Sequence, residues 1–186
     1  LDKPFIIWLL RGLKKALENP SNEEIIFSWE PVVGFCKWIL ENLQDVNQNS
    51  SKSELSDWNQ VCDAVVEIVD TGISVKGVSR ITLALRTQIW GILEALTSDR
   101  FVTPSFTPQY QGTNMGAYQS AINTVRGKAM QAVVRYAAWI RQDIEEPIEV
   151  FRNFEDMPEV KRVLEWHLDP QEDPSFLIRS VYGRFF

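Results

Sequence analysis

The sequence predicts an all-α protein, and two observations carry this prediction. Apolar residues recur at helical spacing along most of the chain, and no stretch alternates apolar and polar residues for long enough to indicate a strand. Five prolines each open an apolar-periodic run, in KPFIIW, EPVVGF, EPIEVF, MPEVKRVL and DPSFLIRSV. Proline at the first helical position loses no hydrogen bond and presets φ, so each of these prolines predicts the start of a helix.

These signals predict helices over residues 4–18, 22–28, 31–45, 54–70, 78–97, 116–145, 147–154, 158–168 and 174–183. The helix over 54–70 shows the pattern clearly, with an apolar stripe of Leu55, Trp58, Cys62, Val65 and Val69. Asp173 is predicted to cap the helix that begins at Pro174. The polar stretch 46–54 predicts a linker, and the glycine-bounded stretch 71–77 predicts a turn.

The composition predicts a globular chain with its own core. Of the 186 residues 45% are hydrophobic and seven are tryptophan, and a chain of this size buries roughly 70% of its unfolded surface. We expect a single helical domain over 1–186, with sub-units at 1–53, 54–99 and 116–186. Because the chain opens on Leu1 and closes on the apolar SVYGRFF, we expect a fragment of a larger protein.

The compartment is expected to be the cytoplasm. No apolar run approaches the length of about 18 residues that spans a bilayer, so we expect no membrane partner. The only cysteines, Cys36 and Cys62, form no CxxC motif and predict free thiols in a reducing compartment.

One segment of the sequence aligns with another. VVGFCKWILENLQD (32–45) aligns without gaps on VVRYAAWIRQDIEE (133–146), and ILEAL (92–96) resembles ILENL (39–43). These offsets of 101 and 53 residues indicate a helical unit that repeats about every 50 residues.

The stretch NTVRGKAMQAVV resembles the VRxxAxxA pattern of HEAT-repeat second helices, through Val125, Arg126, Ala129 and Ala132. Gly127 and the long loop over 98–116 depart from that pattern. The resemblance implies antiparallel helix pairs in a degenerate HEAT- or armadillo-like α-α superhelix, as in segments of large multidomain bacterial proteins. It also implies a scaffold whose concave face binds other macromolecules.

Arg126 lies on the apolar face of its helix, with Met130, Val133 and Ala137. A buried charge must be paired, because an unpaired buried ion costs several kcal/mol. We therefore predict a structural ion pair for Arg126, and the HEAT resemblance implies a partner in the neighbouring turn. A contact with a bound anion is the alternative.

Charge is distributed unevenly along the chain. Residues 1–75 carry a net charge of −6, residues 76–141 a net charge of +6 and residues 142–186 a net charge of −6. The basic centre and the aromatic loop 98–116 predict a partner-binding surface. Its predicted residues are Arg80, Arg86, Phe101, Phe106, Tyr110, Lys128 and Arg135. The alternatives are neutralisation between stacked units and contact with nucleic acid.

We expect no catalytic, cofactor or metal site in this chain. His167 is the only histidine and is expected to be exposed or capping, and the P-loop and HExxH motifs are absent. The seven tryptophans are expected to pack in the core or between repeats. The predicted function is a protein-interaction or regulatory scaffold in a larger protein. A compact bundle that packs on a separate catalytic domain is the alternative.

Overall fold

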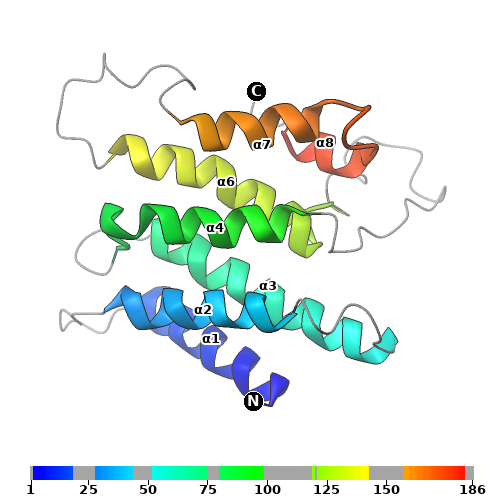
Figure 1. The fold of residues 1–186 in the computed structure, drawn as a ribbon. Coiled ribbons are helices and arrows are strands. Elements are labelled where there is room, and N and C mark those ends of the chain that lie inside the picture. The colour runs from blue at the N-terminus through cyan, green and yellow to red at the C-terminus, as the bar shows by residue number, and fades with distance from the viewer. Residues whose placement is uncertain are drawn as a thin grey trace. The chain divides into compact units, whose positions relative to one another are not determined.

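A computed structural model describes residues 2–18, 28–43, 52–74, 80–98, 119, 121–142 and 157–182. Seven α-helices and one short 3-10 helix lie in these residues, and none of these residues belongs to a strand (Figure 1). The all-α prediction is confirmed for this part of the chain. The chain divides into two units, Leu1–Leu96 and Thr97–Phe186.

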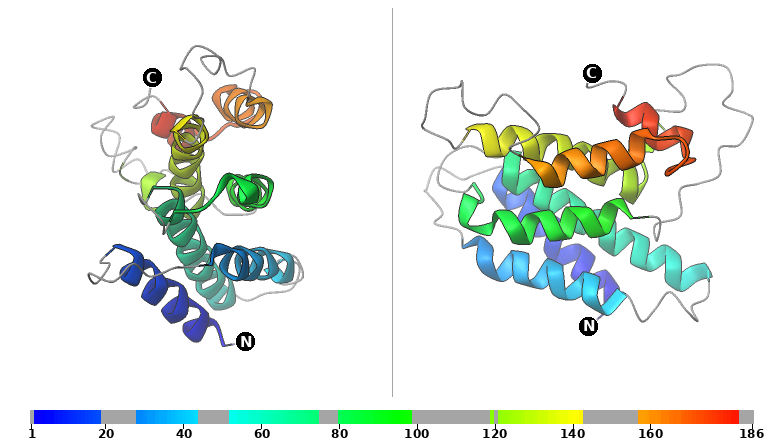
Figure 2. Two further views of the ribbon diagram at one scale, coloured as in Figure 1. Left: turned by 90° about the vertical axis from the view of Figure 1, so that its left-hand side faces the viewer. Right: turned by 45° about the horizontal axis from the view of Figure 1, so that its top comes forward.

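The first unit is built around α3 (Lys52–Ser74), against which both α1 (Lys3–Glu18) and α2 (Trp29–Leu43) pack (Figure 2). The short helix η2 (Leu83–Leu85) leads into α4 (Arg86–Thr97), whose last residue already belongs to the second unit. The core of this unit is made of apolar residues at helical spacing, among them Ile6, Leu10, Val33, Ile39, Val61, Val65, Ile68, Ile89 and Leu93.

Helix α1 begins where the proline signal predicts. The carbonyl of Asp2 accepts the first helical bond from the Ile6 amide at 3.1 Å, and Pro4 follows within the first turn. Ion pairs then join α1 to α3: Lys14 Nζ lies 3.1 Å from Glu67 Oε2, and Arg11 Nη2 lies 3.9 Å from Asp63 Oδ2. The two helices are therefore held by apolar packing with charged pairs along one edge.

Gly72 explains how the chain packs onto the C-terminal part of α3. A Cβ at this position would lie 2.5 Å from both the Trp29 ring and the Ile81 side chain. The Ile81 amide donates to the Gly72 carbonyl at 3.1 Å. The glycine thus leaves room for the start of α2 and for the segment before α4. The predicted turn at 71–77 is wrong for residues 71–74, because these residues belong to α3.

The second unit contains α6 (Val125–Gln142), α7 (Pro158–Leu168) and α8 (Phe176–Tyr182), and α8 packs against both α6 and α7. Aromatic rings fill its core: the Tyr136 and Trp139 centroids lie 5.5 Å apart in a tilted arrangement. The Tyr182 hydroxyl donates to Met130 Sδ at 2.8 Å. Helix α7 has the predicted bounds, because Pro158 stands at its first position.

Helix α6 begins at Val125, although the periodicity predicts an unbroken helix over 116–145. Thr124 causes the break, because its Oγ1 donates to the Ala121 carbonyl at 2.7 Å and accepts from the Gly127 amide at 2.9 Å. The second bond is that of an N-cap residue to the third residue of its helix. A Cβ on Gly127 would lie 1.9 Å from the Ala121 carbonyl oxygen, so this turn requires glycine.

Some of the predicted elements fall on residues that the structure does not describe. The predicted helix at 147–154, the predicted helix at 22–28 apart from residue 28, and residues 99–116 of the aromatic loop lie outside the described residues. The sub-unit limits at 53 and 99 stay predictions. The aligned tryptophans of the proposed repeat occupy different environments, since Trp38 is exposed on α2 and Trp139 is buried in α6.

Among the helices that the structure describes, none combines the length and the apolar character that crossing a bilayer requires.

Candidate functional site

The predicted partner-binding residues divide between the two units. Arg80 and Arg86 belong to the first unit and are half-buried. Lys128 and Arg135 belong to α6 in the second unit, where Arg135 is exposed with its Nη2 3.5 Å from Gln131 Oε1. The predicted aromatic members, Phe101, Phe106 and Tyr110, lie outside the described residues. A shared basic surface of these residues stays a prediction.

Arg126 is buried in the second unit and is 3% exposed. Its Nη2 lies 2.5 Å from Asp173 Oδ2, and its Nε donates to the Thr97 carbonyl at 3.0 Å. The acidic partner therefore stands 47 residues away, between α7 and α8, rather than in the neighbouring turn. The carboxylate that neutralises this guanidinium comes from the chain itself.

His167, at the end of α7, completes this buried cluster. The expectation of an exposed histidine is wrong, because α7 turns His167 inward with Val160, Val163 and Leu164. Its Nδ1 lies 2.7 Å from Asp173 Oδ2 and 3.0 Å from Arg126 Nη2. Asp173 Oδ2 can only accept, so the shorter contact requires a proton on Nδ1. Arg126 Nη2 is itself a donor, so it then lies beside Nδ1 without a hydrogen bond to it. Asp173 Oδ2 thus accepts from both the arginine and the histidine.

The turn between α7 and α8 holds the Asp173 carboxylate in place. Asp173 Oδ1 accepts from the Ser175 amide at 2.9 Å, the Asp173 amide donates to the Asp169 carbonyl at 2.9 Å, and the Asp173 carbonyl accepts from Arg179. Ser175 Oγ in turn accepts from the Ile178 amide at 3.4 Å, so Ser175 rather than Asp173 caps α8. Every polar group of Asp173 has a partner within the second unit.

The surroundings of this cluster favour a structural role. Burial raises the pKa of the Tyr182 hydroxyl, while Arg126 lowers it and Asp173 raises it by smaller amounts. Tyr182 is therefore neutral at physiological pH and serves as a donor to Met130. The three charged or titratable side chains of the cluster are almost fully buried and satisfy one another. Such an arrangement fixes the relative positions of α6, α7 and the turn before α8.

The two cysteines are buried apolar side chains. Cys36 and Cys62 are both free and lie in the core of the first unit. Burial raises the pKa of Cys36 from 9.0 to about 12. Burial and, to a smaller extent, the negative charge of Asp63 raise the pKa of Cys62. Among the residues that the structure describes, no group of three or more His, Cys, Asp or Glu side chains could hold a metal ion.

We expect iodoacetamide to react with both thiols on the order of a thousand times more slowly in the native protein than in urea. Only the thiolate reacts, and raising the Cys36 pKa from 9.0 to about 12 lowers its thiolate fraction about a thousandfold at pH near 8. Mass spectrometry of samples quenched over time measures the two rates. Native alkylation within tenfold of the urea rate would contradict the burial of these thiols.

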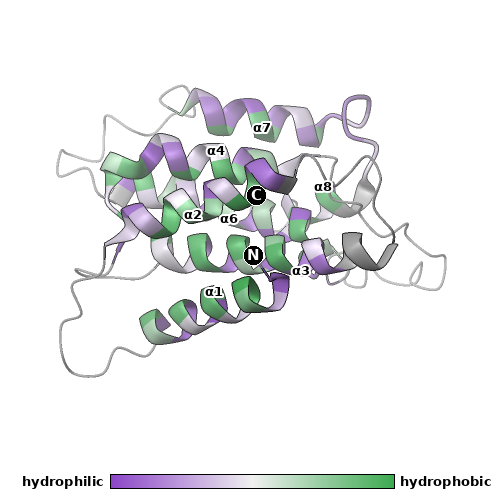
Figure 3. Cartoon of the chain, turned by 60° about the horizontal axis from the view of Figure 1, so that its bottom comes forward, coloured by the Kyte–Doolittle hydropathy of each residue, from purple (hydrophilic) through white to green (hydrophobic). Residues whose placement is uncertain are grey.

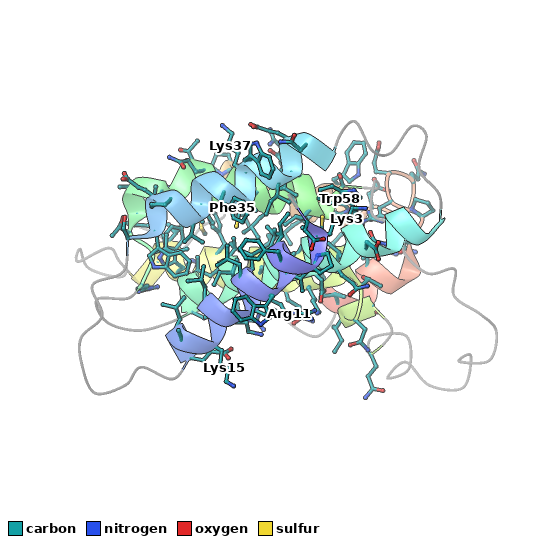
Figure 4. The ribbon with its side chains drawn as sticks, turned by 90° about the horizontal axis from the view of Figure 1, so that it is seen from below. Lys3, Arg11, Lys15, Phe35, Lys37 and Trp58 are labelled. Carbon is teal, nitrogen blue, oxygen red and sulfur yellow. The ribbon has the colours of Figure 1, made fainter. Side chains whose placement is uncertain are left out.

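A cavity of about 400 Å³ lies between α1 and α3 in the first unit. Its lining residues are Lys3, Pro4, Ile7, Trp8 and Arg11 of α1 and Asp57 and Gln60 of α3. Lys3 Nζ stands 5.1 Å from the centroid of the Trp58 ring, a cation–π arrangement on the same pair of helices (Figure 4). This is a concave surface with an apolar wall on α1, two basic side chains, Lys3 and Arg11, and one acidic side chain, Asp57.

Exposed aromatic residues adjoin the cavity. Trp8 is 74% exposed and Phe5 is 50% exposed, and hydrophobic colour covers much of the α1 face turned to the viewer in Figure 3. The expectation that the tryptophans pack inside is therefore wrong for Trp8, for Trp166 on α7 (49% exposed) and for Trp38 (39%). It holds for three others, which are buried: Trp29, Trp90 and Trp139.

The sequence contained a signal for Trp8. Ile6 and Leu10 form the buried stripe of α1, and two residues beyond Ile6 correspond to about 200° around the helix. Trp8 therefore lies nearly opposite the core stripe. The apolar count of PFIIWLL does not reveal the exposure of Trp8, which depends on its angle around the helix.

Comparison with protein-family models, with curated proteins and with solved structures finds no match to the chain.

Proposed function

We propose that this chain is a non-catalytic protein-interaction module whose first unit binds a partner polypeptide through the exposed face of α1. The observation that supports the proposal is the 74% exposure of Trp8 next to a cavity of about 400 Å³. Aromatic residues are enriched at protein interfaces, and tryptophan dominates many binding hot spots. An exposed tryptophan beside a concavity is therefore typical of a surface that a partner covers.

The wider setting of the module is part of the same proposal. The VRxxAxxA pattern at Arg126 favours a degenerate HEAT- or armadillo-like array of helix pairs, which would serve as a scaffold or regulatory segment of a larger protein. The free buried thiols of Cys36 and Cys62 favour a reducing, cytoplasmic setting. In the competing proposal the chain is a compact helical bundle that packs on a separate catalytic domain.

The proposal is tested by site-specific photocrosslinking in cells that make the protein. Benzoylphenylalanine replaces Trp8 in one sample and Gln171, an exposed polar turn residue of the second unit, in the control. We expect a discrete adduct larger than the 21.4 kDa chain from position 8 and none from position 171. Mass spectrometry then identifies the captured polypeptide. The absence of a position-dependent adduct would contradict the proposal.

A further inference from the structure

We infer that the cavity between α1 and α3 receives an acidic peptide segment that carries one large apolar anchor residue. This inference rests on the proposed function and specifies the chemistry of the partner. The anchor enters the apolar part of the cavity, and carboxylates beside the anchor meet the basic side chains of α1.

The shape of the cavity favours a peptide. Its five α1 residues follow one face of the helix from Lys3 to Arg11, a length of about 12 Å. Phe5 does not line the cavity, yet it is half-exposed on the same helix, so the unpartnered apolar surface extends beyond the cavity. A polypeptide covers both parts, as in complexes in which a segment lies in an apolar groove.

The apolar wall defines the anchor. Pro4, Ile7 and Trp8 give the α1 side of the cavity an aromatic and aliphatic surface. A volume of about 400 Å³ lies at the lower end of the range of about 300–1,000 Å³ for ligand clefts. Such a space suits the side chain of one phenylalanine, tryptophan or leucine together with its neighbouring backbone.

The charges define what flanks the anchor. Helix α1 carries four basic residues and one acidic residue over Lys3–Glu18, and its cavity-lining cations stand at the two ends of the groove. Lys3 lies over the Trp58 ring (Figure 4), and the Arg11 side chain is 49% exposed and forms one long ion pair, with its Nη2 3.9 Å from Asp63 Oδ2. Both cations can therefore bind a partner carboxylate. Asp57 on the α3 side repels acids, which places the partner's carboxylates along α1.

Three labelled nine-residue peptides test this inference by fluorescence anisotropy with the full chain. The first has a central phenylalanine between glutamates, the second has serine in place of the phenylalanine, and the third has lysines in place of the glutamates. We expect the first to bind at least about tenfold more tightly than the other two, and to weaken as salt rises. Equal binding of the glutamate and lysine peptides would overturn the inference.

Two variants and their matched controls identify the site. Trp8→Ala should weaken binding of the glutamate peptide at least about tenfold, whereas Trp166→Ala, which removes an exposed tryptophan from the second unit, should not. Lys3→Glu should weaken the glutamate peptide and strengthen the lysine peptide. Lys37→Glu makes the same charge change at an exposed position of α2, away from the cavity (Figure 4). It should neither weaken binding of the glutamate peptide nor strengthen binding of the lysine peptide. Circular dichroism checks that each variant keeps its helices.

The outcomes separate the two proposals. If benzoylphenylalanine at position 8 crosslinks to a polypeptide but no peptide shows the charge preference, the inference fails and the proposed function stands. If position 8 gives no adduct beyond that of position 171 and peptide binding does not depend on Trp8, both fail. If vesicles of phosphatidylcholine and phosphatidylglycerol, but no peptide, bind in a Trp8-dependent manner, the exposed face recognises a lipid surface and the inference is overturned.

Discussion

Replacing Arg126 with methionine is expected to destabilise the second unit by about 3–5 kcal/mol, the cost of leaving a buried charge without its partner. Methionine keeps much of the apolar volume but removes the donors to Asp173 and to the Thr97 carbonyl. The buried carboxylate then keeps only His167 and the Ser175 amide. Urea unfolding followed by far-ultraviolet circular dichroism measures the loss.

The control for this prediction is Arg135→Met on the same helix. Arg135 is exposed, and its change should alter the free energy of unfolding by no more than about 0.5 kcal/mol. The double variant Arg126→Met/Asp173→Asn should lower the free energy of unfolding by less than the sum of the two single changes, because it removes both charges of the pair. If Arg126→Met unfolded at the same urea concentration as the wild type, the ion pair would not stabilise the unit.

Replacing Gly127 with alanine is expected to destabilise the second unit by about 1–3 kcal/mol, as overpacking against a rigid neighbour does. The new Cβ would lie 1.9 Å from the Ala121 carbonyl oxygen, a backbone atom that also accepts from Thr124. Relief of this clash requires opening the turn that caps α6. The turn also places Arg126 opposite Asp173, so the expected loss includes part of the ion pair.

Gly91→Ala is the matched control, since Gly91 is exposed in α4 and an added Cβ meets no atom within 4 Å. Alanine favours a helix over glycine by up to about 1 kcal/mol, so this change should leave the free energy of unfolding equal or raise it. Differential scanning calorimetry compares the two variants. If the Gly127→Ala protein melted at or above the wild-type temperature, the turn before α6 would accommodate the new Cβ without loss of stability, and the prediction would be wrong.

The local proline signal predicts the bounds of α7, but it places the start of α8 at 174, whereas α8 begins at Phe176, and the start of α2 at 31, whereas α2 begins at Trp29. Pro158 at the first position and the apolar spacing after it define α7 at both ends. The start of α6 could not be predicted in this way, because the apolar period continues through Thr124. Only the hydrogen bonds of its hydroxyl, and the space that Gly127 leaves, turn this position into a helix start.

Local sequence signals also do not predict which side chains pair in the buried cluster of Arg126, His167 and Asp173. A charge on an apolar helix face predicts that Arg126 needs a partner, but the choice of Asp173 depends on tertiary packing across 47 residues. The burial of His167 and the exposure of Trp8 both follow from angles on their helices, because His167 continues the stripe of Val160, Val163 and Leu164 and Trp8 lies opposite the stripe of α1. Both positions could therefore have been found from the sequence.

The position of Asp173 also bears on how the second unit is synthesised. A ribosome makes α6, with Arg126 near its start, 47 residues before it makes the carboxylate that neutralises this arginine. At about 5–20 residues per second this interval lasts several seconds, during which the cluster lacks its acid. The turn between α7 and α8 therefore completes the charged cluster before α8 adds its own buried side chains. We expect nascent chains that end before residue 173 to be sensitive to protease in α6.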